Sequence, residues 1–377
     1  MLDAVISGSG INSAVIALLL DQAGFKVKII DNQSAKLSHS LRTVTLNLQS
    51  MKLFKSLGID IEACPIKSML VRDAVGTGKI EFDAKDVEQS ELAFTVYYSE
   101  LIQKLNTKIN HLTTDYISKN IHSASDTISI ELLNGDTLDA KLLIASNSKP
   151  LTIKNLFSLS APDEYKQLAA TFLISSSQLV PTRATQVFYN KDIFALMPIH
   201  KITKSKVNTF SVVWSLEAPE DSAIDYVNTN LTKIEDVLGA KLLIDSDIET
   251  FSLKKFIATK YFTNRSCLIG DAAHVIHPMA GQGLNLGLAD CYALYSEINK
   301  ARNEGIDIGS SKVLKRYEIK RKLLNDSMIK GVHRIHALFQ SDNIYIRVIR
   351  NSGFLLVNNI NPLKKFFIKS AEGIFDI

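Results

Sequence analysis

The feature that most constrains this sequence is a glycine-rich turn between two apolar segments near the start of the chain. Residues 2–7 (LDAVIS) are apolar and β-branched, and the turn GSGINS follows them directly. The stretch AVIALLLDQAG predicts a helix that ends at Gly24, and FKVKIID predicts a second strand that ends at Asp31. Strand, turn, helix and strand form a βαβ unit with a parallel pair, so we expect an α/β fold.

The turn has the composition of a phosphate-binding loop. Gly8 allows a sharp reversal of the chain, and Gly10 lets a phosphate approach the backbone at the positive end of the following helix. Ser13 stands at the third position, where Gly or Ala is usual because helix and sheet pack closely. Asp31 follows about 20 residues later, where a carboxylate can accept hydrogen bonds from ribose hydroxyls. The segment predicts a dinucleotide site; the alternative is a structural turn followed by a chance acid.

A second glycine-rich segment, CLIGDAAHVIHPMAGQGLNLGLADC, runs from Cys267 to Cys291. An apolar strand is expected to deliver a carboxylate that can bind a ribityl hydroxyl, and a proline then fixes the turn into a glycine loop. The N–H groups where the next helix starts can stabilise negative charge on the pyrimidine edge of a reduced flavin. The residues expected to bind the cofactor here are Asp271, Pro278, Gly281, Gln282, Gly283, Leu284 and Asn285.

A metal site is an alternative interpretation of the same segment, because Asp271, His274 and His277 are spaced three residues apart. The proline and the glycine loop explain the segment better, so we expect no metal. We interpret His274 as a packing or helix-end residue rather than an acid–base catalyst.

The two glycine-rich segments lie far apart in the sequence, with strand-rich stretches between them. The domains are therefore expected to be discontinuous. We predict a dinucleotide-binding domain from residues 1–61, 99–155 and 262–305, a β-rich substrate domain from residues 62–98 and 156–261, and a helical C-terminal region from residues 306–377.

Composition excludes several classes of protein. Of 377 residues, 46% are hydrophobic and 22% charged, which is ordinary for a globular protein. The three cysteines are far apart and show no CxxC spacing, so neither a disulfide framework nor a zinc site is indicated. A net charge of +4 without a basic cluster gives no reason to expect nucleic acid as a partner. We expect neither a signal peptide nor a membrane-spanning helix, and hence a cytoplasmic protein.

The pairing of GSGINS with GDAAHVIHPMAGQGLNLGLADC resembles the group A flavin monooxygenases, the class of p-hydroxybenzoate hydroxylase. Four further segments resemble the ubiquinone-biosynthesis hydroxylases in particular: LRTVTLNLQSMKLFKSLGI, IFALMPI with FSVVWSL, LKRYEIKRK, and LFQSDNIYIRVIRNSGFLLVNNINPLKKFFIKSAEGI. The resemblance covers most of the chain. It implies a Rossmann-like FAD-binding domain with an inserted β-rich substrate domain. It also implies that Arg42, which follows the second strand, lies near the cofactor.

The resemblance also implies a reaction, hydroxylation of the aromatic ring of a polyprenylated phenol. FAD would be reduced by NAD(P)H, the usual donor, and would then add dioxygen to form a C(4a)-hydroperoxide that the phenol ring attacks. The cofactor performs the difficult step, while the protein orients the ring and excludes water. No protein nucleophile is needed, so no catalytic residue is assigned.

The sequence departs from the family pattern where Asn147-Ser148 replaces an Asp-Gly pair tied to positioning the cofactor and the nicotinamide donor. Tyr97-Tyr98 replaces polar residues before a helix, and these tyrosines are candidates for the substrate side or ordinary residues of a strand end. Two alternatives therefore stay open. The chain could be a weakly active or inactive flavoprotein subunit of a ubiquinone-biosynthesis assembly, or it could hydroxylate a small soluble aromatic. A homo-oligomer or a biosynthetic complex is a separate expectation about its partners.

The C-terminus predicts an amphipathic helix. Asn361 suits its N-cap and Pro362 its first turn. Such a helix could lie in a bilayer interface with its lysines towards anionic lipid, giving peripheral contact with the inner face of the cell membrane, or it could pack on the protein core. The expected stripe comprises Leu363, Phe366, Phe367, Ser370, Ala371, Ile374 and Phe375, with Lys364, Lys365 and Lys369 around it.

Overall fold

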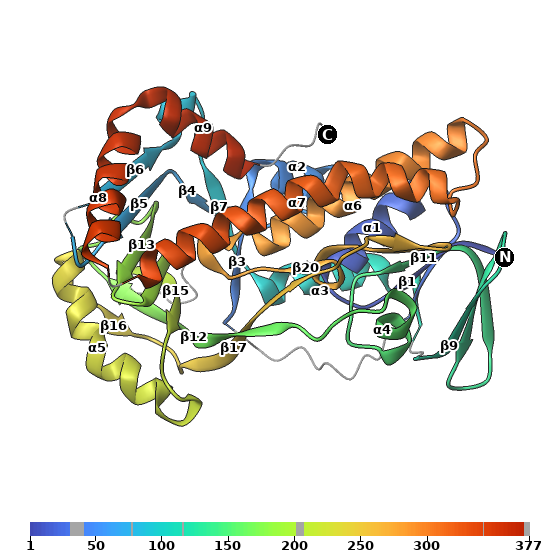
Figure 1. The fold of residues 1–377 in the computed structure, drawn as a ribbon, viewed down its shortest axis with the longest axis horizontal. Coiled ribbons are helices and arrows are strands. Elements are labelled where there is room, and N and C mark those ends of the chain that lie inside the picture. Colours follow the sequence, from blue (N-terminus) through green and yellow to red (C-terminus); the bar gives the residue numbers. More distant parts are fainter. Residues whose placement is uncertain (31–40, 77, 115–116, 201–206, 342, 373–377) are drawn as a thin grey trace.

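The computed structural model describes residues 1–30, 41–76, 78–114, 117–200, 207–341 and 343–372. It is elongated, with a largely parallel sheet at one end, an antiparallel sheet at the other and a long helix running along both (Figure 1). The predicted α/β architecture is confirmed.

The N-terminal segment forms the predicted βαβ unit, in which α1 connects the parallel strands β1 and β2. Strand β1 also pairs in parallel with β11, and β11 with β19, so both glycine-rich segments follow strands of one sheet. The order is β18-β19-β11-β1-β2-β8, extended from β11 by β10 and β9. The elements are β1 (Leu2–Ser7), α1 (Ile11–Gln22), β2 (Val27–Ile30), β8 (Thr113–Thr114), β9 (Ser118–Ser123), β10 (Ile128–Leu132), β11 (Thr137–Ala145), β18 (Phe262–Thr263) and β19 (Ser266–Leu268).

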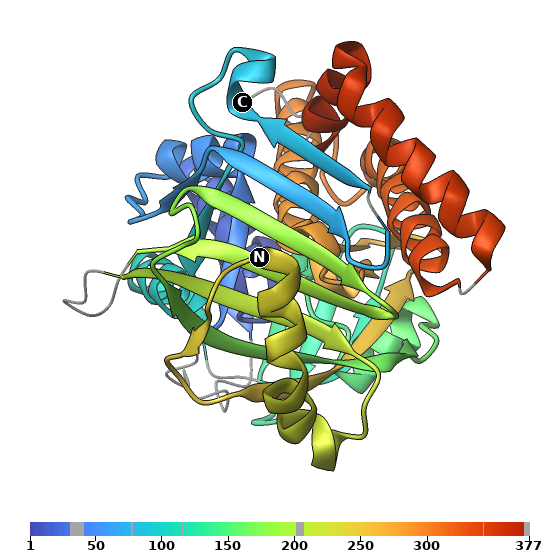
Figure 2. The same ribbon diagram turned by 90° about the vertical axis from the view of Figure 1, so that its left-hand side faces the viewer.

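The second sheet has nine strands in the order β20-β17-β12-β15-β14-β13-β5-β6, with β16 beside β12. One face is an apolar core that includes Phe194 and Trp214, and α5 lies across it (Figure 2). The other face points towards the glycine loop and the long helix. The elements are β5 (Ser68–Asp73), β6 (Lys79–Asp83), β12 (Asp163–Ser176), β13 (Arg183–Tyr189), β14 (Asp192–Ile199), β15 (Asn208–Leu216), α5 (Ala223–Leu238), β16 (Leu243–Ile244), β17 (Glu249–Ile257) and β20 (His274–Val275).

A small three-stranded sheet, ordered β3-β7-β4, completes the β structure. Helices and helical turns fill the connections. The strands are β3 (Thr43–Asn47), β4 (Cys64–Ile66) and β7 (Ala93–Tyr97); the helices are α2 (Leu48–Ser56), α3 (Tyr98–Ile109), α4 (Leu151–Phe157) and α6 (Gly283–Asn303); and the short turns are η1 (Ala84–Val87), η2 (Glu220–Ser222), η3 (Gly270–Ala272) and η4 (Met279–Gly281).

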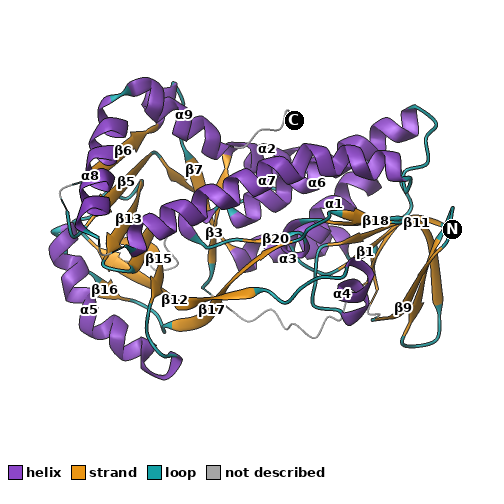
Figure 3. Cartoon of the chain, viewed as in Figure 1, coloured by secondary structure: helices purple, strands orange, loops and turns teal. Residues whose placement is uncertain are grey.

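The C-terminal region is helical, as predicted. Helix α7 (Ser311–Gln340) runs beside α6, and α8 (Ile344–Asn359) and α9 (Asn361–Glu372) turn around the edge of the second sheet (Figure 3). Helix α8 covers the edge strand β6: Asn351 Oδ1 accepts a hydrogen bond from Gly78 N at 2.7 Å, and Asn358 Oδ1 accepts one from Glu81 N at 3.1 Å. A buried ion pair, Arg350 Nη2 to Asp73 Oδ2 at 2.6 Å, joins α8 to the neighbouring strand β5.

The structure also differs from the sequence-based expectations. The first helix begins at Ile11, within the segment GSGINS rather than after it, and ends at Gln22 rather than Gly24. Helix α5 lies within a stretch expected to be strand-rich, and it buries Val227, Leu231 and Ile234 against the second sheet. The domain boundaries themselves remain a prediction.

A buried carboxylate connects the long helix to the second glycine-rich segment. Asp290 of α6 is completely buried and accepts hydrogen bonds from Gly270 N at 3.1 Å, from Arg321 Nε at 2.8 Å and from Asn325 Nδ2 at 3.0 Å. Its other close partner is His274 Nε2, at 2.7 Å. Burial alone would raise the pKa of Asp290, but the charges and hydrogen bonds of His274 and Arg321 bring it down to about 2.

We predict that this network makes stability fall steeply in acid. Because the folded pKa of Asp290 lies below the unfolded value of about 3.9, its contribution is full above about pH 4 and is lost as the pH falls towards 2. Asp290→Asn should lower the free energy of unfolding by roughly 3 kcal/mol near neutral pH, because Arg321 stays buried without its counter-charge. It should also flatten the fall between about pH 4 and pH 2. Urea unfolding across this range measures both effects.

The matched control is Asp326→Asn, which removes a partly exposed α7 carboxylate that pairs with Lys322 at 3.1 Å. Such pairs contribute below about 1 kcal/mol, so this variant should follow the wild type at every pH. If the free energy of unfolding depended on pH in the same way in wild type and Asp290→Asn, the assignment of the acid sensitivity to Asp290 would be wrong.

Candidate functional site

The first glycine turn lies at the carboxyl end of β1. Gly8 has φ +124°, and a Cβ there would lie 2.6 Å from Ser146 Oγ, so only glycine fits. Gly10 precedes α1, and a Cβ there would meet no protein atom within 4 Å. No side chain caps α1, and its first turn contains no acid. The N–H groups at this helix start are therefore available to a phosphate.

Ser13, which departs from the usual Gly or Ala, is fully buried and hydrogen-bonded to the Ser146 hydroxyl. This bond joins α1 to the end of β11, immediately before Asn147-Ser148. Asn147 Oδ1 accepts a hydrogen bond from Lys149 N at 2.9 Å, which closes a short turn. The two departures from the family pattern are thus neighbours in space.

Asp271 follows β19 and is exposed between the buried residues Gly270 and Ala272. Desolvation by the protein around the carboxylate raises its pKa above the ordinary value, while His274, Arg42 and Lys149 oppose that rise. The structure therefore brings Arg42 and Asp271, which are far apart in sequence, to one place. Asp31 lies outside the described residues.

Arg42 also lies over the Tyr98 ring, with Cζ 4.8 Å from the ring centroid. Tyr98 begins α3, and Tyr97 ends β7 with its hydroxyl 3.4 Å from His200 O. Tyr98 therefore stands beside Arg42 and Asp271, both of which influence the pKa of its hydroxyl. No local pattern predicts this stacking, because Tyr98 is distant from Arg42 and Asp271 in the chain.

The second glycine loop is shaped by Pro278, with φ −65°, at the start of η4 and by Gly281, with φ +61°. A Cβ on Gly281 would lie 3.0 Å from Thr45 Cβ. Gln282, Gly283 and Leu284 lead into α6, which also has no side-chain cap and no acid in its first turn. This helix start can also receive negative charge.

The Asn285 side chain is fully used within the protein. Its oxygen accepts from Asn47 N at 3.0 Å and from Ser50 Oγ at 2.7 Å, and its nitrogen donates to Thr45 O at 2.9 Å and Gly281 O at 3.2 Å. Asn285 was predicted to bind the cofactor, but because its side chain is occupied, only its backbone could do so. Its side chain fixes the glycine loop to β3.

Asn12 is a feature that the sequence analysis missed. Its side chain lies against two glycines: a Cβ on Gly270 would be 2.1 Å from Asn12 Nδ2, and one on Gly287 2.4 Å. Its Oδ1 is buried and has no hydrogen-bond partner among the described residues. An acceptor without a partner, between the two glycine-rich segments, fits a bound dinucleotide that spans them.

The two other candidate metal ligands of the segment point elsewhere. His274 pairs with Asp290 at 2.7 Å, as expected of a packing residue, and His277 lies near Gln167 Oε1 at 3.3 Å. Burial and the neighbouring His336 and His333 lower the pKa of His277 to about 3. Within the described part of the chain, no group of three His, Cys, Asp or Glu residues could hold a metal ion.

The carboxyl ends of β1, β11 and β19, two uncapped helix starts and an exposed carboxylate beside an arginine define the class of a dinucleotide-binding protein with a second glycine loop. A family model described as FAD binding domain matches residues 1–112 and 171–331. These residues are well over half of the chain, which therefore belongs to the FAD-binding-domain family.

Relatives with known names match nearly the whole chain. A mitochondrial ubiquinone biosynthesis monooxygenase (COQ6) of Dictyostelium discoideum is 26% identical, with 92% of this chain and 84% of the relative covered. The 3-demethoxyubiquinol 3-hydroxylase of Escherichia coli is 26% identical, with 98% of each covered. The resemblance drawn from the sequence motifs is confirmed.

Solved structures agree in fold. p-Nitrophenol 4-monooxygenase from Pseudomonas putida superposes with a TM-score of 0.78 at 17% identity, covering 99% of this chain and 98% of that one. HpxO of Klebsiella pneumoniae, solved with FAD and uric acid, gives 0.77 at 15% identity, covering 98% and 97%. The predicted fold of an FAD-dependent monooxygenase with an inserted β-rich domain is confirmed.

We predict that Asp271→Ala weakens FAD binding about tenfold or more, because a hydrogen bond to a charged group is lost. Ultrafiltration and flavin absorbance give the dissociation constant. Asp136→Ala, which removes an exposed carboxylate from the β10–β11 turn, is the control and should bind FAD as the wild type does. Unchanged FAD affinity in Asp271→Ala would remove this residue from the site.

Proposed function

We propose that this protein is an FAD-dependent monooxygenase that hydroxylates the aromatic ring of a polyprenylated phenol in ubiquinone biosynthesis, with dioxygen as co-substrate. The observation that carries the proposal is the similarity to 3-demethoxyubiquinol 3-hydroxylase, which extends over 98% of both chains and includes both glycine-rich segments. A fold match alone would support many activities, because one fold hosts many functions.

In this proposal, the uncapped start of α1, with Gly8 and Gly10, binds the pyrophosphate of FAD. Asp271 accepts a hydrogen bond from the ribityl chain, and Arg42 lies beside it. The loop of Gly281, Gln282 and Gly283, with Leu284, presents the start of α6 to the pyrimidine edge of the flavin. When bound, FAD supplies the oxygen-activating chemistry, and the protein orients the ring and excludes water.

NAD(P)H is the proposed electron donor, and Asn147-Ser148 is the feature that bears on it. The family's Asp-Gly pair is replaced here by a turn that Asn147 closes onto Lys149 N. We infer slow direct reduction by NADPH. A weakly active subunit of a biosynthetic assembly is the second candidate, and this substitution is the observation that favours it.

We predict ring hydroxylation independent of the natural donor. FAD-loaded protein, reduced anaerobically with one equivalent of dithionite and mixed with oxygenated buffer and a short-tailed 2-prenylphenol, should give one hydroxylated product per flavin. With NADPH instead, flavin bleaching should be at least tenfold slower than hydroxylation. Mass spectrometry and absorbance at the flavin bands measure the two steps.

Protein reduced and mixed in the same way with a short-tailed prenylbenzene that lacks the hydroxyl is the control and should give no product. Peroxide without product from the phenol would overturn the hydroxylase proposal and favour the subunit. Fast NADPH bleaching would contradict only the inference about the donor.

Membrane contact is a separate part of the proposal. No helix in the described part of the chain is long and apolar enough to cross a bilayer. In α9, Ile368 is the buried residue, and Lys364 faces Asp86 at 4.0 Å. Phe366 and Phe367 are exposed. The two rings of the expected stripe are therefore exposed, whereas Leu363 and Ser370 of the same stripe are partly buried. Ile374 and Phe375 lie outside the described residues.

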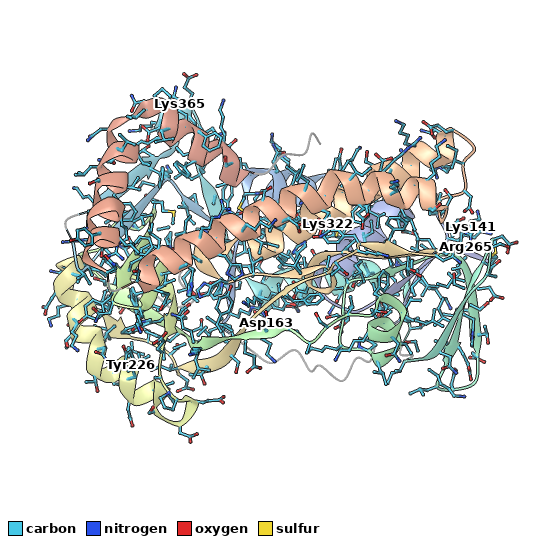
Figure 4. The ribbon with its side chains drawn as sticks, viewed as in Figure 1. Lys141, Asp163, Tyr226, Arg265, Lys322 and Lys365 are labelled. Atoms are coloured by element: carbon cyan, nitrogen blue, oxygen red, sulfur yellow. The ribbon has the colours of Figure 1, made fainter. Side chains whose placement is uncertain are left out.

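Further exposed apolar side chains, Leu355, Leu356 and Ile360, stand on the adjoining end of α8. Lys365 lies at the outer edge of the same corner (Figure 4), and Lys369 is also exposed. Exposed rings beside lysines are the composition of a surface that enters the headgroup region of an anionic bilayer.

We predict that Phe366→Ser together with Phe367→Ser lowers partitioning onto vesicles of anionic phospholipid about tenfold or more. The reason is that the transfer of two phenyl rings from water into the bilayer no longer contributes to binding. Vesicle sedimentation measures this. Leu133→Ser is the control, since Leu133 is as exposed as Phe366 (61% against 62%) but lies in the β10–β11 hairpin. Equal partitioning of both variants and wild type would exclude this corner as a membrane contact.

A further inference from the structure

The small sheet β3-β7-β4 faces the second sheet across a narrow space. Thr43 Oγ1 donates a hydrogen bond to Ser211 Oγ of β15 at 2.7 Å. Ile66 of β4 packs with Ala184 and Met197 of β13 and β14. Because side chains alternate along a strand, the residues in register with these on each strand also point into the space between the sheets.

Gln186 is the central residue on the second-sheet side of this space. It lies on β13 between Ala184, which belongs to the apolar cluster with Ile66, and Phe188, which packs with Met279 of the glycine loop. Gln186 is 4% exposed, and its Oε1 has no hydrogen-bond partner among the described residues. A buried acceptor left without a partner is costly and uncommon in proteins.

The cross-strand neighbours of Gln186 show that this part of the face is not completely covered, although Oε1 itself is closed to solvent. Ala195 pairs with Gln186, and Val213 pairs with Ala195, on the same face of the sheet. Both stay partly exposed, although they lie inside a nine-stranded sheet. Their neighbours on the opposite face, such as Phe194 and Trp214, are fully buried. This partly covered stretch extends from the cluster of Ile66, against which Ala195 packs, towards the cluster of Phe188.

Thr95 provides a second orphaned oxygen on the facing surface. It is 2% exposed, and its Oγ1 has no partner within the described residues. Thr95 pairs with Thr45 of β3, the residue against which Gly281 of the glycine loop packs. The strands that carry the two orphaned oxygens therefore both reach the turn Met279–Gly281, through Phe188 on one side and Thr45 on the other.

We propose that Gln186 recognises the hydroxyl group of the aromatic substrate, by accepting a hydrogen bond from it at Oε1. This inference rests on the proposed phenol hydroxylation and names a residue that selects the substrate. The ring lies between the apolar clusters of Ile66 and Phe188, and the Thr95 hydroxyl lines the opposite wall.

The chemistry of the open face indicates a neutral ring hydroxyl as the ligand. The described residues that face the space between the two clusters on β13, β14 and β15 are Gln186, Ala195, Val213, Ser211 and Ser215, and they include no Lys or Arg. Among these five described residues, a carboxylate would find no counter-charge. An oxygen that only accepts requires an O–H or N–H from its ligand, and a phenol supplies one.

The test compares a phenol with its methyl ether on FAD-loaded protein. 2-Geranylphenol and 2-geranylanisole differ in one donor hydrogen, and the change in the flavin absorption spectrum during titration gives both dissociation constants. Wild-type protein should bind the phenol about tenfold tighter than the ether, because the ether leaves Gln186 without a donor. Gln186→Met and Gln186→Leu should each reduce this ratio to about one, by weakening phenol binding alone.

Thr185→Val is the matched control. It removes a buried polar group from the next position of the same strand, on the opposite face of the sheet, and should keep the wild-type ratio. Thermal unfolding without ligand adds a second measurement. Because Oε1 has no protein partner, Gln186→Met should unfold at the wild-type temperature or above it.

The outcomes separate this inference from the proposed function. If wild type prefers the phenol and both Gln186 variants keep that preference, Gln186 is not the recognising residue, while phenol hydroxylation still stands. If wild type with bound FAD binds neither compound, the proposed substrate class fails and this inference fails with it. A marked loss of thermal stability in Gln186→Met would show that Oε1 serves the fold, which overturns the inference.

Discussion

The structure depends on one buried carboxylate. Asp290 takes hydrogen bonds from the backbone of the acidic turn and from the long C-terminal helix, and its negative charge is balanced by Arg321. The position of Asp271 is thereby coupled to residues that follow it by 50 positions along the chain. An apolar residue at position 290 could fill the space, but it could not hold Gly270 N and orient His274 at once. Polar networks of this kind specify one arrangement when every member is satisfied.

Asn285 makes the corresponding connection on the other side of the site. Its four hydrogen bonds join the glycine loop to β3 and α2, elements from the first sixth of the chain. Segments brought together from both ends of the sequence thus meet at one loop, which also borders the space in front of Gln186. A glycine loop held in this way can serve as a rigid wall for both a bound aromatic ring and the cofactor.

Much of the architecture could be predicted because its signals are local. The βαβ unit, the second glycine-rich segment and the helical tail each follow from patterns within 30 residues or fewer. Helix α5 was missed because its apolar positions stand among many strand-like runs. Three features could not be predicted, because each depends on which distant segments become neighbours. They are the contact of Arg42 with Tyr98, the packing of Asn12 against Gly270 and Gly287, and the orphaned oxygen of Gln186. Family resemblance supplied Arg42 as a site residue, but it did not supply its partner.

Helix α8 has a consequence for the behaviour of the chain before it is complete. Two of its asparagines, Asn351 and Asn358, accept hydrogen bonds from N–H groups at the outer edge of the nine-stranded sheet, a place where another extended segment could otherwise add. During synthesis, β6 exists long before α8 emerges, since more than 250 residues separate them. Until α8 is present, the edge of β6 is uncovered, and a strand of another molecule can pair with it. The C-terminal helices therefore protect the sheet against self-association as well as completing the fold.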